Sequence, residues 1–113
     1  MAVKQIVVGS DARDFAATLV RSSDGAPINP TSARLQGKSK QLRASPIDVT
    51  LVVGSGPTAN VCSYAEFGNL VTAAMLASRS FALYTFRVKY VTGSPGKADY
   101  SPEFQYEWVA GPV

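Results

Sequence analysis

Two segments near the end of the sequence, residues 81–91 and 100–109, place a large apolar side chain at nearly every second position. Side chains alternate between the two faces of a strand, so this pattern predicts two strands that each bury one face. A loop rich in Gly and Pro joins the segments, which favours an antiparallel hairpin with coincident aromatic faces. The residues expected on the buried face are Tyr84, Phe86, Val88, Tyr90, Phe104, Tyr106 and Trp108.

The opposite face of the expected hairpin is polar. It carries Arg87 and Lys89 on the first segment, and Glu103 and Glu107 on the second. Opposite charges across a strand pair stabilise it by up to about 1 kcal/mol, so we expect cross-strand ion pairs here. We interpret the aromatic face as the core of a sandwich, and the alternative is an exposed face that lines a sugar-binding site.

Earlier in the chain, short alternating segments are separated by turn residues at fairly regular intervals. The clearest segment, Ile47 to Val53, puts four apolar side chains on one face and Asp48 and Thr50 on the other, which predicts one half-buried strand. Short strands at this spacing are typical of a β-sandwich or barrel, and the chain length suits a single domain over residues 1–113. The other expected strands lie within 3–8, 14–21 and 33–38.

Residues 61–80 fit two interpretations. The sequence Ser63-Tyr64-Ala65-Glu66 matches a capping box, which predicts one short helix around residues 64–79. Against this, Gly, Asn, Val and Thr residues between 68 and 72 are unfavourable inside a helix. The favoured alternative comprises a strand around 61–65, a turn at 67–69, a strand from Leu70 and a short helical turn near 74–78.

The residues that most enzymes use for catalysis are missing. Histidine is absent, which removes the usual general base near neutral pH and the commonest metal ligand. Cys62 is the one cysteine, and its alternating apolar surroundings predict a small strand residue rather than a nucleophile. The glycines at 54 and 56 lack the spacing of a phosphate-binding loop. We therefore expect no enzymatic activity, no metal and no cofactor.

Targeting signals are not expected either. Residues 1–10 contain one short apolar triplet, and no segment approaches the roughly 20 apolar residues of a membrane helix. The net charge is +3, which is weak evidence for a nucleic-acid partner. We expect a chain that is made in the cytoplasm and stays soluble, or is carried out within a particle, without membrane contact.

One charge cluster stands out as a candidate binding site. The stretch from Gly25 to Ile47 contains no acidic residue. We favour a solvated loop that keeps the fold soluble, and the alternatives are contact with an acidic partner surface or with a phosphate backbone. A nucleic acid is the less favoured partner, because the nearest aromatic residues are far away in the sequence. The candidate contact residues are Arg34, Lys38, Lys40 and Arg43.

The order of motifs also carries a family resemblance. The segment RDFAATLV (13–20) is followed by the turn sequence SDGAPINPTSA (23–33). Later, LVTAAML (70–76) leads to YTFRVKY (84–90), and YEWV (106–109) follows as a closing strand. This order resembles that of small immunoglobulin-like (Ig-like) modules in tailed-phage virions, such as the N-terminal domain of phage baseplate upper proteins.

The resemblance implies a fold and a role. The fold is a mainly β, Ig-like antiparallel sandwich. The role is a non-catalytic structural component of a virion, in the tail, the baseplate or a head decoration, which contacts other virion proteins in many copies or as a homo-oligomer. The alternative function, from the aromatic residues, is a module that binds carbohydrate or a cell surface.

Overall fold

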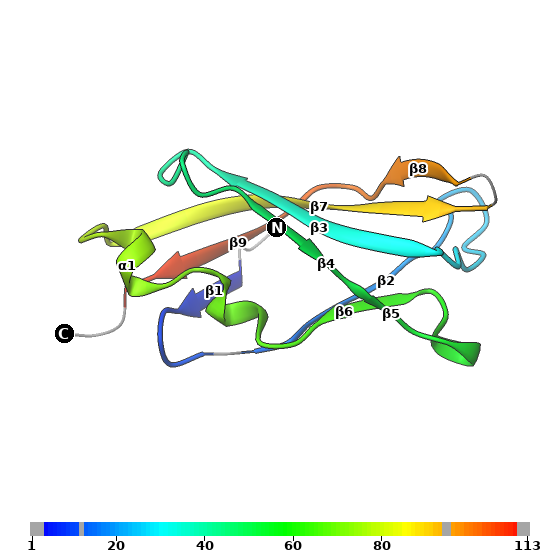
Figure 1. Ribbon diagram of the computed structural model, residues 1–113, viewed down its shortest axis with the longest axis horizontal. Coiled ribbons are helices and arrows are strands. Elements are labelled where there is room, and N and C mark those ends of the chain that lie inside the picture. The colour runs from blue at the N-terminus through cyan, green and yellow to red at the C-terminus, as the bar shows by residue number, and fades with distance from the viewer. Residues whose placement is uncertain (1–3, 12, 94–95, 111–113) are drawn as a thin grey trace.

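Two β-sheets pack face to face in the computed structural model, which describes residues 4–11, 13–93 and 96–110 (Figure 1). Most of the described chain is extended, and the helical segments are short. The strands are β1 (Lys4–Val7), β2 (Phe15–Thr18), β3 (Ser32–Ser39), β4 (Ile47–Thr50), β5 (Val52–Val53), β6 (Val61–Tyr64), β7 (Phe81–Thr92), β8 (Lys97–Tyr100) and β9 (Phe104–Val109). The helical segments are the 3₁₀ turns η1 (Gly56–Thr58) and η2 (Phe67–Leu70), and the single-turn helix α1 (Ala73–Leu76).

The strand order is that of an immunoglobulin-like sandwich. One sheet has the order β1-β9-β7-β3-β4, with β8 also paired to β7, and the other has the order β2-β6-β5. Named in chain order, these are strands G, F, C and C′ facing strands B, E and D. The mainly β, Ig-like prediction is confirmed. All neighbouring strands are antiparallel except β1 and β9, which run parallel.

The segment Ile47 to Val53 differs from its prediction as one strand. Its first part, β4, pairs with β3 in the larger sheet, and its last part, β5, pairs with β6 in the smaller sheet. The chain changes sheets at Leu51, whose amide donates to the carbonyl oxygen of Ala33 at 2.9 Å. The predicted alternation still holds, because both sheets turn their apolar faces to the same interior.

The aromatic hairpin is confirmed. Strand β9 pairs with the first half of β7, placing Tyr84 opposite Tyr106 and Phe86 opposite Phe104. Tyr84, Phe86 and Trp108 are fully buried. Most of the aromatic face is therefore the core of the sandwich, and these three rings do not line an open sugar site.

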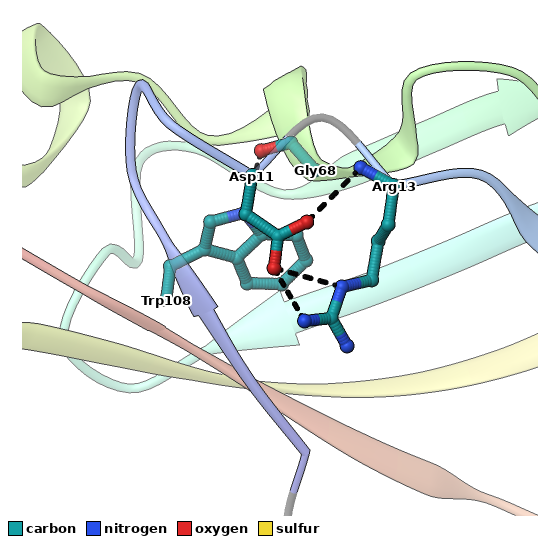
Figure 2. A network of polar contacts seen from close by, with 4 residues as sticks. All are labelled: Asp11, Arg13, Gly68 and Trp108. Atoms are coloured by element: carbon teal, nitrogen blue, oxygen red, sulfur yellow. Dashed lines mark hydrogen bonds and ion pairs between the residues drawn. The ribbon is translucent and has the colours of Figure 1, made fainter.

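A short plug closes one end of this core. Phe67, the first residue of η2, is fully buried, and its ring centroid lies 4.8 Å from that of Tyr106 and 5.3 Å from that of Trp108. Next to it, the indole N–H of Trp108 donates to the carbonyl oxygen of Gly68 at 2.9 Å (Figure 2). One turn of backbone thus satisfies the polar atom of the largest core side chain.

The same plug is tied to the loop between β1 and β2. The amide of Gly68 donates to the carbonyl oxygen of Arg13 at 3.1 Å, and the amide of Glu66 donates to Asp14 Oδ1 at 2.9 Å. Figure 2 shows Arg13 folded back on Asp11, to which its guanidinium and its amide both donate. Hydrogen bonding from Arg13 lowers the pKa of the Asp11 carboxyl.

Residues 61–80 match neither interpretation fully. The capping box does not start a helix, because Ser63 lies in β6 and Glu66 adopts a left-handed backbone with φ of 55°. The predicted strand from Leu70 is also wrong, since η2 and α1 fill that stretch. The helical turn expected near 74–78 exists as α1, where the Thr72 side chain accepts a hydrogen bond from the amide of Met75 at 3.2 Å.

Candidate partner-binding face

The four predicted contact residues fall into two groups. Strand β3 alternates sharply, so that Arg34, Gln36 and Lys38 point outward from the sandwich while their neighbours are buried. Lys40 and Arg43 instead lie in the loop between β3 and β4, and both are exposed. The structure therefore keeps Arg34 and Lys38 on one sheet face and sets the other pair apart at its end.

Side-chain hydrogen bonds fasten the β3–β4 loop to β7. The hydroxyl of Tyr84 donates to the carbonyl oxygen of Ser45 at 2.8 Å. Gln41 Oε1 accepts from the amide of Leu83 at 3.1 Å, and the loop residue Leu42 is buried. Lys40 and Arg43 are therefore presented by a loop anchored to the core, not by a solvated tether.

Pairing of β3 with β7 brings Arg87 and Lys89, which the sequence analysis considered only as part of the hairpin, next to the cations of β3. Lys89 lies directly opposite Arg34, and Arg87 lies opposite Gln36, to whose Oε1 it donates at 3.2 Å. The four cations Arg34, Lys38, Arg87 and Lys89 thus share the outer surface of two adjacent strands. We call these four residues the basic face.

The predicted ion pairs of the hairpin are wrong. Lys89 lies opposite Tyr100, and the guanidinium of Arg87 stacks 3.9 Å from the centroid of that ring. Glu107 lies opposite Leu83 and accepts a hydrogen bond from Gln5 at 2.7 Å. The error has a physical source, because β8 replaces β9 beside the second half of β7 and shifts the partners of both cations.

One acidic residue lies within the basic face. Arg34 Nε donates to Asp48 Oδ1 at 2.7 Å, and its NH1 group donates to Thr50 Oγ1 at 2.9 Å. The Arg34 and Asp48 side chains are 46% and 52% exposed, so this pair contributes at most about 1 kcal/mol. Arg34 and Lys89 meanwhile oppose each other as like charges, which destabilises a strand pair by a similar amount. The charged side chains of this face therefore contribute little net stability to the fold.

The side chains that the structure describes on this face suit a binding surface. Within the residues that the structure describes, no group of three His, Cys, Asp or Glu side chains converges to hold a metal. Cys62 is fully buried in β6, as its strand pattern predicted, and burial raises the pKa of its thiol. The Arg and Lys side chains of the basic face offer charge to carboxylates or phosphates, and the Arg guanidinium groups add fork-shaped donors.

The comparisons with known proteins give no relative. No family model, no curated protein and no solved structure matches the chain. Across the described ranges, no helix has the length and apolar character needed to cross a membrane.

Proposed function

We propose that this chain is a non-catalytic structural component of a bacteriophage virion, present in many copies and acting through protein–protein contacts. The observation that carries the proposal is the basic face on a firmly paired sheet. These cations contribute little to folding, and Arg34 and Lys89 directly oppose each other across β3 and β7, so a partner surface is the better account of their arrangement. The partner is an acidic surface of another virion protein or of a neighbouring copy.

Support for the virion comes from where the family-like motifs lie. The Asp-Gly turn forms the tip of the loop after β2, where Asp24 Oδ1 accepts from the amide of Ala26 at 3.0 Å and Gly25 has a φ of 70°. The Tyr84–Tyr90 motif forms the middle of β7, which pairs with strands on both sides. These motifs therefore build the sandwich itself, as they would in an Ig-like virion module.

A protein partner fits the basic face better than a nucleic acid does. A nucleic-acid backbone carries a phosphate at every nucleotide and would meet the Asp48 carboxylate as it crossed this face, whereas a protein partner can place a neutral or basic residue opposite Asp48. The nearby ring of Tyr100 is already stacked against Arg87, so a base would have to compete with that contact. A surface of mixed polarity with paired charges is typical of a protein–protein contact.

Mass spectrometry and imaging of purified particles test the proposal. We expect the protein in particles of the phage that encodes it, in multiple copies per particle, and we expect the Lys38→Glu/Lys89→Glu variant to be lost from them. Lys97→Glu is the matched control, because Lys97 lies on β8 outside the basic face and should remain incorporated. Absence of the wild-type protein from particles would overturn the virion role. Normal incorporation of the double variant would show that the basic face does not serve this role.

A further inference from the structure

A groove of 1080 Å³ lies at one end of the sandwich, between the loop that follows β2 and the β7–β8 hairpin. Figure 1 shows both segments at the end of the molecule far from α1. One wall includes Val20 and Asn29, and the other includes Tyr90, Asp99 and Tyr100. The Tyr100 ring stacks on Arg87 of the basic face, and the other four residues belong neither to that face nor to the aromatic plug.

Topology makes this end a place where a binding site is expected. The two walls are the B–C loop and the F–G connection of the Ig-like order, which lie together at one end of such a sandwich. In immunoglobulin variable domains the equivalent loops form the antigen-binding end. Loops held on a rigid scaffold are common sites of ligand recognition, which gives the groove a general structural precedent.

Backbone hydrogen bonds hold the first wall in place. Val20 pairs with Pro27 as an isolated bridge. The amides of Arg21 and Gly25 donate within the loop at 2.8 Å, and the amide of Ile28 donates to the carbonyl oxygen of Leu19 at 3.0 Å. This wall is therefore preformed, so a ligand would not have to order it.

The second wall is also fixed. The amide of Tyr100 donates to Asp99 Oδ1 at 2.8 Å, and Ser101 exchanges two hydrogen bonds with Val88, one through its hydroxyl and one through its amide. Tyr90 lies opposite Asp99, and burial together with the Asp99 charge raises the pKa of the Tyr90 phenol. A phenol and a carboxylate thus stand side by side at the mouth of the sandwich.

The groove carries almost no net charge. The charged side chains in its lining are Arg21 and Asp99. Arg21 Nε lies 3.5 Å from Oδ1 of Asp24, a residue that is not part of the lining. The other polar groups that line it are hydroxyls and one amide, on Thr18, Ser22, Ser23, Asn29, Thr92 and Ser101. Such a lining gives many neutral hydrogen bonds and no cluster of cations for a phosphate or sulfate.

Exposed apolar surface is also available there. Val20 is 50% exposed and Tyr90 is half-buried, and both lie in the lining. Tyrosine offers a rigid, flat apolar ring with a polar tip, and tyrosine with serine and asparagine is the composition of binding loops in antibodies. Flat apolar faces framed by neutral hydrogen-bonding groups match the two surfaces of a sugar ring, its C–H face and its hydroxyls.

We propose that this groove binds a neutral oligosaccharide, with the Tyr90 ring against a sugar face and with Asp99 and Asn29 bonded to hydroxyls. Its volume lies just above the roughly 300–1,000 Å³ found for ligand pockets, which suits several linked sugars better than one. This inference goes beyond the virion role, because neither depends on the other.

A glycan array printed with neutral, sialylated and sulfated oligosaccharides tests the groove with the whole chain. We expect binding to neutral oligosaccharides, weakened about tenfold or more by Tyr90→Ala, as for loss of a ring contact. Asp99→Asn should weaken the same interactions. Phe81→Ala is the matched control, because Phe81 is an exposed aromatic at the far end of β7 and should leave the array profile unchanged. Circular dichroism of each variant verifies the fold.

Three outcomes would overturn the proposal. The first is that no neutral oligosaccharide on the array binds. The second is that neutral oligosaccharides bind but both groove variants bind them as the wild type does. The third is that only sialylated or sulfated glycans bind and that Lys38→Glu abolishes this, which would place the ligand on the basic face. Incorporation into particles is measured separately, so failure here leaves the virion role standing.

Discussion

The two ends of the sandwich use aromatic residues in opposite ways. At the end closed by η2, Phe67 and Trp108 are fully buried and their ring centroids lie 5.3 Å apart. At the groove end, Tyr100 is exposed and Tyr90 is half-buried. A ring that fills a core stabilises the fold, whereas a ring held at the surface remains available to a ligand.

Strand β7 contributes to both ends of the sandwich. The first half of β7 is covered by β9, which supplies Phe104, Tyr106 and Trp108 to the interior. Pairing with β9 ends at Phe86, and the second half of β7 pairs with β8, whose four residues are all exposed. The change of partner strand therefore marks the boundary between the packed core and the groove.

Removing the plug should give the largest effect. Phe67→Ala deletes a ring that contacts Phe15, Phe86, Tyr106 and Trp108, so we expect a loss of about 3–5 kcal/mol in the free energy of unfolding. Urea denaturation followed by Trp108 fluorescence measures it. Phe81→Ala, at an exposed position, should cost under about 1 kcal/mol. Equal losses at the two sites would break the contrast between core and surface rings.

Overpacking the same core should give the second-largest loss of stability. Gly37 lies opposite Phe86 on β3, and a Cβ atom there would fall well inside van der Waals contact with the Phe86 ring. That ring is fully buried, so it has no room to move away. We expect Gly37→Ala to lower the free energy of unfolding by about 1–3 kcal/mol.

A double-mutant cycle sharpens this prediction. Phe86→Leu creates space beside residue 37, so the double variant should lose less stability than the sum of the two single losses. Purely additive losses would show that the Phe86 ring does not limit the space at Gly37.

These residues also show how far the sequence alone could lead. Alternation identified the β7–β9 hairpin and its buried face, because a period of two is a local property. The sequence did not reveal that Phe67 plugs the core, since a 3₁₀ turn has no strong local pattern and its place depends on packing. It also missed Arg87 and Lys89 beside Arg34, because their nearness follows from the β3–β7 register. The groove was missed for the same reason, as its walls are far apart in the sequence.

Alkaline pH should act on the closed end through Tyr84. Burial raises the pKa of its phenol, so the folded state favours the neutral form. The unfolded chain ionises this group near pH 10, which means that stability is complete below that pH and falls as the pH rises further. Denaturation midpoints between pH 8 and pH 11 should decline, and Tyr84→Phe should decline less steeply. Parallel declines would show that other groups dominate the alkaline loss.

The smallest effect on folding should come from the groove. Tyr100→Ala removes an exposed ring and its stacking on Arg87, which is worth roughly 0.5–1 kcal/mol at an exposed site, so the urea midpoint should shift little. Tyr84→Ala, a like change on β7 in the core, should cost several times more. If Tyr100→Ala instead unfolded the protein as Tyr84→Ala does, the groove end would be part of the structural core. A near-neutral result would mean that folding does not require this ring at the surface, and the reason for its place would have to be sought in what it contacts outside the chain.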